Sequence, residues 1–173
     1  FSAFTYHMYP LLLERGLSTT SVVQAIALIG PAQVAGRVIL GVFARRVPVR
    51  IVGTLITLVF PLAFGALLIF SADFLTVALI CIAYGCVNGI FTIVRGLAVP
   101  EMLSKRAYGA INGVITAPVF IAKAAAPLGA AALWTAGESY DLVLLGIIML
   151  ACILAASFAL AATLSRRGVL ATS

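Results

Sequence analysis

Long apolar runs separated by short polar connections make up almost the whole chain. Crossing about 30 Å of hydrocarbon takes roughly 20 helical residues, because each helical residue rises about 1.5 Å. The pattern predicts five complete membrane-spanning helices and, at residues 1–13, one truncated helix. The predicted complete spans are residues 18–43, 49–70, 74–99, 108–136 and 140–164.

Composition agrees with an all-α membrane protein. Hydrophobic residues make up 64% of the 173 positions and charged residues 9%, and the mean hydropathy is +1.22. A surface that faces water needs far more charge, so an ordinary soluble domain is excluded. The net charge of +6 does not indicate a nucleic-acid partner, because the basic residues cluster at the ends of apolar runs. The expected surroundings are a lipid bilayer.

The charged residues between the runs alternate in sign along the chain. One set of ends carries Arg45, Arg46, Arg50, Lys105, Arg106, Arg166 and Arg167, opposed by Glu101. The other set carries Glu14, Asp73, Glu138 and Asp141, opposed by Arg15. Lysine and arginine gather on the cytoplasmic side of helical membrane proteins. We therefore expect a multi-pass protein of the inner (plasma) membrane whose basic loops and C-terminus are cytoplasmic.

Glycine and proline are frequent within the predicted spans. Two GxxxG steps, Gly85–Gly89 and Gly109–Gly113, would let helix backbones approach closely in lipid. The prolines expected to interrupt or kink helices are Pro31, Pro61, Pro118 and Pro127. Each feature alone fits ordinary membrane packing, and together they are typical of the bending helices of transporters.

The three cysteines, Cys81, Cys86 and Cys152, lie inside apolar runs without metal-ligand spacing. We therefore expect packed, inert thiols, with no metal site and no cofactor. The chain has neither an initiator methionine nor a signal-peptide pattern, so we expect it to be a piece of a longer protein.

Three cations, Arg37, Arg95 and Lys123, lie at least one helical turn inside predicted spans that contain no acidic residue. A charged group in hydrocarbon costs at least about 2.5 kcal/mol, so each cation needs a partner. That partner is either a bound anion or a carboxylate from a part of the protein that this chain lacks.

Lys123 lies near the middle of its span and belongs to a polar stripe. At about 100° per residue, Asn112, Thr116, Lys123 and Pro127 fall within roughly 60° of one another. Such a stripe is expected to face protein or water. We interpret Lys123 as a contact for a substrate or ion. The alternative is a structural lysine that binds backbone carbonyls or a carboxylate.

Gln33 and Arg37 lie one helical turn apart and share a face. A guanidinium beside an amide is suited to binding a carboxylate, so both are candidate substrate contacts. The alternative is an arginine that extends to the cytoplasmic surface.

A second polar stripe consists of Tyr84, Asn88, Thr92 and Arg95. Tyr84 and Asn88 lie nearer the middle of the membrane and are candidates for lining a cavity. Arg95 lies nearer the cytoplasmic end, where we expect a structural role and a pairing with Glu101.

His7, the one histidine of the chain, is the side chain that titrates near neutrality and is a candidate for proton coupling. The alternative is a hydrogen-bonded structural residue. Trp134 and Tyr140 flank the outer ends of two spans and are interpreted as interface anchors.

The segment GRVILGVFARRVPVR, residues 36–50, resembles the cytoplasmic loop motif of the major facilitator superfamily, which runs roughly G-x-x-x-D-R-x-G-R-R. The matching residues are Gly41, Arg46 and Arg50. Arg45 replaces the acidic residue and Pro48 the second glycine, so the usual charge relay of this loop is not expected here. Degenerate copies of this kind are typical of the second half of these proteins. The next loop, EMLSKRAYGAINGV, extends the resemblance over nearly the whole chain.

The resemblance implies that residues 1–173 form a C-terminal six-helix bundle with a 3+3 inverted repeat, and that an N-terminal bundle is absent from this chain. A narrower resemblance is to the oxalate/formate and monocarboxylate branch. In that branch an arginine on the eighth helix, and in some members a lysine on the eleventh, contact the substrate carboxylate. Arg37 and Lys123 occupy corresponding places.

These observations favour a secondary active transporter that moves a small organic solute, an anion or carboxylate, by alternating access. Lys123 and Arg37 would pair with the anion, and an ion or solute gradient would supply the energy, because no nucleotide-binding loop is present. Further contacts would come from Gln33, Tyr84, Asn88, Asn112 and Thr116. The open alternatives are an efflux pump for hydrophobic drugs and a non-transporting membrane sensor. An enzyme is not expected, because no cluster of catalytic side chains occurs within the spans.

Overall fold

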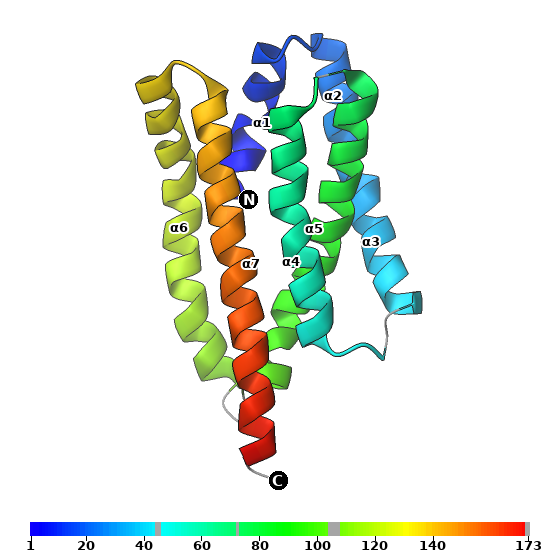
Figure 1. Ribbon diagram of the computed structural model, residues 1–173, viewed down its shortest axis with the longest axis vertical. Coiled ribbons are helices and arrows are strands. Elements are labelled where there is room, and N and C mark those ends of the chain that lie inside the picture. The colour runs from blue at the N-terminus through cyan, green and yellow to red at the C-terminus, as the bar shows by residue number, and fades with distance from the viewer. Residues whose placement is uncertain (44–45, 72, 104–107, 172–173) are drawn as a thin grey trace.

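Seven helices, packed lengthwise, form the described part of the chain (Figure 1). The computed structural model describes residues 1–43, 46–71, 73–103 and 108–171, with side chains up to Ser165. The helices are α1 (Ser2–Glu14), α2 (Thr19–Ala27), α3 (Ile29–Phe43), α4 (Val49–Ile69), α5 (Phe74–Met102), α6 (Tyr108–Gly137) and α7 (Tyr140–Ala171). Of the basic residues used to predict sidedness, Arg45, Lys105 and Arg106 lie outside the described residues, as do the side chains of Arg166 and Arg167.

Five stretches of helix are long and apolar enough to cross a membrane. They are Thr19–Phe43, Val49–Ile69, Phe74–Met102, Tyr108–Gly137 and Tyr140–Ser165. Each coincides with one predicted span, and α1 corresponds to the shorter run at residues 1–13. The prediction of an all-helical membrane architecture is therefore confirmed.

The helix ends gather at two opposite ends of the bundle (Figure 1). At one end, here called the Glu14 end, α1, α4 and α6 finish, and α2, α5 and α7 begin. At the other, here called the Arg46 end, α3 and α5 finish, and α4 and α6 begin. This is the alternation that the charge pattern predicts. The first residue of α1 lies part-way along the bundle.

The helices pack around one apolar core. α3 lies against α5, α4 lies between α5 and α7, and α1 packs on α6 while also contacting α2 and α7. At the centre, the ring of Tyr84, 4% exposed, packs against Phe4, Phe60 and Phe64 with ring centroids 5.0, 6.0 and 5.8 Å away. Aromatic pairs at these separations add about 0.5–1.5 kcal/mol each to apolar burial, so this cluster joins α1, α4 and α5 firmly.

Glycines allow α3 and α5 to approach closely. A β-carbon at Gly36 would lie 2.2 Å from the carbonyl oxygen of Cys86, and one at Gly85 would lie 2.8 Å from Ala32. The predicted close approach at the Gly85 step is therefore confirmed. The Gly109–Gly113 step is different, because nothing lies within 4 Å of a β-carbon at either position. The prediction of a close helix contact there is wrong within the described chain, since α6 turns that face outward.

The predicted span 18–43 is divided into α2 and α3 at Leu28, three residues before Pro31. Proline has no N–H, so Pro31 leaves the carbonyl of Ala27 without its helical partner. The predicted interruption at Pro31 is confirmed.

Three other prolines lie inside continuous helices, Pro61 in α4 and Pro118 and Pro127 in α6. These prolines therefore do not interrupt their helices, and the expected kinks stay a prediction. At Pro127 the reason is visible, because Ser2 Oγ donates a hydrogen bond of 2.8 Å to the carbonyl of Lys123, the group that this proline leaves unpaired. A membrane helix tolerates proline where a neighbouring helix supplies the missing donor.

Candidate functional site

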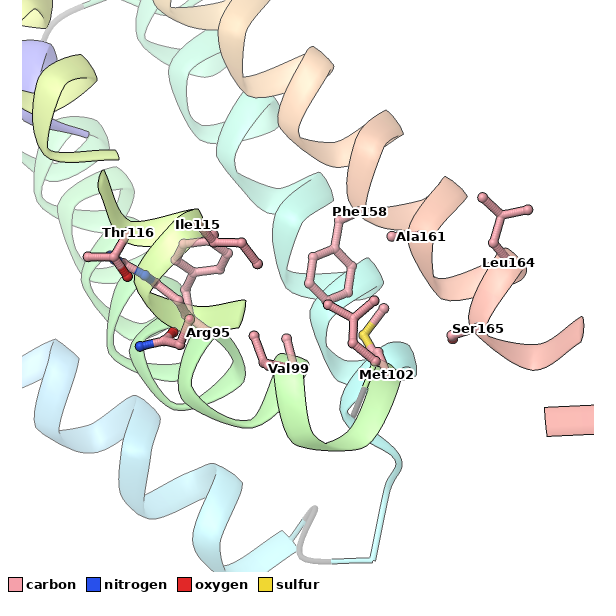
Figure 2. A pocket seen from close by; sticks show the side chains of 13 residues that line it. Arg95, Val99, Met102, Ile115, Thr116, Phe158, Ala161, Leu164 and Ser165 are labelled. Carbon is pink, nitrogen blue, oxygen red and sulfur yellow. The ribbon is translucent and has the colours of Figure 1, made fainter. Parts of the chain in front are cut away.

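A cavity of about 820 Å³ opens between α5, α6 and α7, in the part of the bundle nearer the Arg46 end (Figure 2). Its polar lining residues are Arg95, Asn112, Thr116 and Ser165. Its apolar lining residues are Phe91, Ala98, Val99, Met102, Leu103, Ile115, Phe158, Ala161 and Leu164. Figure 2 shows Arg95 and Thr116 on one side of the cavity and the α7 residues on the other. A cavity of this size suits a small-molecule ligand.

Arg95 faces this cavity instead of forming the predicted pair with Glu101. The Glu101 carboxylate accepts a hydrogen bond of 3.2 Å from the backbone N–H of Val49, the first residue of α4. A carboxylate is favourable at a helix N-terminus, where backbone N–H groups lack partners. The predicted pairing was wrong because sequence spacing along α5 does not reveal that the start of α4 competes for Glu101.

Asn112 and Thr116 of the predicted α6 stripe lie together in the cavity, whereas Lys123 lies elsewhere. Its carbonyl binds Ser2, which places this turn of α6 against α1, and its side chain is exposed. The described residues offer Lys123 no acidic partner within ion-pair distance. Its role in binding a substrate stays a prediction.

Gln33 and Arg37 lie on α3, apart from the cavity. Gln33 is half-buried, and its backbone touches α5 where a β-carbon at Gly89 would come within 2.2 Å of its carbonyl oxygen. Arg37, one turn later, is exposed. α3 and α6 make no contact with each other within the described chain, so the structure does not bring Arg37 and Lys123 together.

Tyr84 and Asn88 differ in their surroundings. Tyr84 belongs to the buried aromatic cluster, whereas Asn88 is half-buried and its carbonyl accepts a hydrogen bond of 2.9 Å from the Thr92 hydroxyl. Neither lines the cavity, which receives only Arg95 from the predicted α5 stripe. Their role as substrate contacts also stays a prediction.

His7 links three helices through both ring nitrogens. Nε2 lies 3.1 Å from the carbonyl oxygen of Pro127 on α6, and Nδ1 lies 3.3 Å from the hydroxyl of Tyr140 on α7. A carbonyl can only accept, so Nε2 carries the hydrogen and Nδ1 of the neutral ring accepts from Tyr140. This arrangement matches the structural alternative for His7, and proton coupling stays a prediction.

A polar network that the sequence analysis missed lies at the Glu14 end. Arg15 forms an ion pair with Asp141 and donates to the carbonyl of Leu67 at 2.6 Å. Glu14 accepts from the backbone N–H of Tyr140 at 2.8 Å. The signal in the sequence was the pair of adjacent opposite charges, Glu14 and Arg15, at the end of an apolar run. Two such side chains can each bind a different neighbouring helix.

The two predicted interface anchors both contact this network. Trp134 Nε1 donates to Glu14 at 3.3 Å, and its side chain is 42% exposed. Tyr140 is only 9% exposed and binds His7, so its side chain packs within the bundle, and its role as an interface anchor stays a prediction. Its position at the start of α7 turns the ring toward α1.

The loop-motif residues lie around the start of α4. Gly41 lines a small cavity of about 210 Å³ beside Val49 and Glu101. Arg46 is exposed, and Arg50 is half-buried in the first turn of α4. Within the described chain, Arg50 Nε is buried without a hydrogen-bond partner.

Metal-ligating side chains do not gather within the described residues, which contain no group of three or more that could hold an ion. Cys81 is buried and Cys86 is half-buried, in agreement with packed thiols. Cys152 is exposed on α7, so the prediction of a packed thiol is wrong there.

The helices define the class of the molecule: this chain is an integral membrane protein, and the regular elements of its described residues are all helices. Comparison with protein-family models, curated proteins and solved structures finds no match.

Proposed function

We propose that this chain belongs to a secondary transporter that carries a small organic anion across a membrane by alternating access. The observation that carries the proposal is a cationic side chain, Arg95, that lines a ligand-sized cavity together with Asn112 and Thr116. An arginine within a membrane-spanning helix is costly unless it faces water or an anion, which makes it a marker of a solute pathway. Lys123 and Arg37, both exposed on spanning helices, add two more cations to the proposed solute pathway.

Helix packing supports the inverted repeat that the resemblance to the major facilitator superfamily implies. An inverted repeat of this kind pairs α1 with α5, α4 with α7, and the α2–α3 pair with α6. Under this pairing the α3–α5 contact corresponds to the α6–α1 contact, and the α4–α5 contact corresponds to the α7–α1 contact. All four contacts are present, although the α6–α7 contact has no counterpart between α3 and α4 in the described residues.

Two hydrogen bonds correspond to each other under the same pairing of helices. Glu14, the last residue of α1, binds the first backbone N–H of α7, and Glu101, near the end of α5, binds the first backbone N–H of α4. The two caps lie at opposite ends of the bundle, as expected for repeats of inverted topology.

The exposed faces of α3 and α6 support a second bundle as partner. Ala130 is the buried residue of α6, and Ala32 and Gly36 are those of α3. These helices also carry Lys123 and Arg37. In the proposed transporter, an N-terminal bundle covers these faces, the solute passes between the two bundles, and the Arg46 end is cytoplasmic.

The test is uptake of radiolabelled organic acids by the full-length protein in proteoliposomes. We expect Lys123→Gln and Arg37→Gln each to lower carboxylate uptake about tenfold or more, because a charge-assisted hydrogen bond contributes about 1.5–3 kcal/mol. Lys123→Arg and Arg37→Lys are the matched controls, since they keep the charge and should retain more of the flux. If carboxylate uptake is unchanged in both glutamine variants, the proposal that the solute is an organic anion fails.

A second candidate function is expulsion of hydrophobic compounds, which the apolar part of the cavity lining favours. In that case Lys123 pairs with an acidic residue of the second bundle. Ethidium efflux by the full-length protein, together with no carboxylate uptake, distinguishes this function from the first.

A further inference from the structure

We infer that the cavity between α5, α6 and α7 binds a monocarboxylate with an extended apolar body, held at its carboxylate end by Arg95. The inference rests on the proposed function and specifies its substrate class. It assigns the anchoring role to Arg95, which lies in the cavity, whereas Lys123 and Arg37 lie outside it.

The polar part of the cavity fits one carboxylate. Arg95 offers a planar array of N–H donors that matches the two carboxylate oxygens. Asn112 and Thr116, one turn apart on α6, offer an amide and a hydroxyl as further donors. Within the described chain no acidic residue lies within ion-pair distance of Arg95, so a bound anion would supply the missing charge.

The rest of the cavity does not fit a small, fully hydrophilic anion. Phe91, Val99, Met102, Ile115 and Phe158 line it with aromatic and aliphatic surface. A dicarboxylate such as oxalate would leave this surface in contact with water and its second charge without a partner. An apolar body removes that surface from water, and each buried methylene strengthens binding about fourfold.

The cavity also has a wall that can be altered without touching the cation. Ala161 of α7 lines the cavity, and Ala156 is an exposed alanine of the same helix that does not. Replacing Ala161 with tryptophan fills space in the cavity, whereas the same replacement at Ala156 adds bulk on another face.

The test is equilibrium dialysis of radiolabelled butyrate, hexanoate, octanoate and decanoate against the full-length protein in phosphatidylcholine nanodiscs, with empty nanodiscs subtracted. We expect affinity to rise about fourfold per methylene. Arg95→Gln and Ala161→Trp should each weaken decanoate binding about tenfold or more. Arg95→Lys should keep more of the affinity than Arg95→Gln, and Ala156→Trp should bind as the unaltered protein does.

Three results would overturn the inference. They are butyrate bound as tightly as decanoate, decanoate affinity unaffected by Arg95→Gln or by Ala161→Trp, and loss of decanoate binding when phosphatidylglycerol replaces the zwitterionic lipid. The last would assign the cavity to a lipid head group. If decanoate binds at Arg95 but no acid is transported, the proposed function fails alone. If acids are transported without decanoate binding in the cavity, this inference fails alone.

Discussion

The backbone of Gln33 on α3 touches Gly89 on α5 so closely that a β-carbon at Gly89 would lie 2.2 Å from the Gln33 carbonyl oxygen. Real β-carbons do not approach a carbonyl to this distance, so any larger residue must move one backbone away from the other. The same holds at Gly36, where the obstacle is the Cys86 carbonyl. The close α3–α5 contact therefore requires glycine, which has no side chain, at these two positions.

The first prediction is that Gly89→Ala destabilises the bundle by about 1–3 kcal/mol, the usual cost of overpacking. Gly96→Ala on the same helix is the control, because nothing lies within 4 Å of a β-carbon there. That control should be neutral or slightly stabilising, since alanine is the better helix former by about 1 kcal/mol. Thermal unfolding of both variants in nanodiscs measures the difference, and equal melting temperatures would contradict the close approach.

The second prediction concerns the two carboxylate caps. Removing the Glu101 side chain in Glu101→Ala leaves the Val49 N–H without its acceptor, and should cost about 1 kcal/mol. Hydrogen exchange of the Val49 amide should accelerate in this variant, and exchange of the Tyr140 amide should accelerate in Glu14→Ala. In each variant the other amide serves as the internal control. Exchange that rises equally at both amides in either variant would indicate general loosening instead of a local cap.

The third prediction follows from Asp73, which caps the start of α5. Hydrogen bonds from the Thr76 hydroxyl at 2.5 Å and the Thr76 backbone N–H at 3.0 Å lower the pKa of the Asp73 carboxyl from its ordinary value. A lowered folded-state pKa means that the ionised carboxylate stabilises the fold above the ordinary aspartate pKa of about 3.9. This stabilisation is lost as the pH falls through the folded-state pKa.

The unaltered protein should therefore melt at a higher temperature than Asp73→Ala at pH 7, and the gap should narrow as the pH is lowered below about 4. Asp73→Asn keeps an oxygen acceptor without the titrating charge. Its difference from Asp73→Ala should be less dependent on pH. If the difference in melting temperature between the unaltered protein and Asp73→Ala stays constant down to pH 3, the stabilisation by this cap does not depend on the ionisation of Asp73.

Sequence reasoning located the helices well because the length of an apolar run is a local property. Each span could be read from consecutive residues, and a hydrocarbon layer sets its length. Which residues meet in a cavity is not local. Arg95, Asn112 and Thr116 converge because α5 and α6 lie beside the same part of α7, and the sequence of one helix carries no direct record of that neighbour.

The two ends of the α5 stripe show this limit clearly. Tyr84 and Arg95 share one polar face by helical periodicity, but Tyr84 meets the rings of α1 and α4, whereas Arg95 meets a cavity. A stripe several turns long passes different neighbours along its length. Periodicity therefore gives the face of a helix, and packing decides what each part of that face contacts.

The fourth prediction is that His7 and Tyr140 are energetically coupled. Tyr140→Phe removes the hydroxyl that donates to Nδ1 and should cost about 1 kcal/mol. In a His7→Ala background the same change should cost little, because the acceptor is already gone. A double-mutant cycle on thermal stability measures the coupling, with Tyr108→Phe, an exposed tyrosine on α6, as control. Additive effects of the two changes would rule out the hydrogen bond.

The fifth prediction uses the carbonyl of Lys123, which loses its helical partner because Pro127 has no N–H. Ser2 Oγ replaces that donor at 2.8 Å, so Ser2→Ala should cost about 1 kcal/mol by leaving the carbonyl unpaired. In a Pro127→Ala background the new N–H can bind the Lys123 carbonyl within α6. Ser2→Ala should then cost close to nothing, while the His7 contact to the carbonyl of residue 127 is kept, because alanine has the same backbone carbonyl. Melting temperatures of the four proteins give the coupling directly, and an equal cost of Ser2→Ala in both backgrounds would show that the serine does not compensate for the proline.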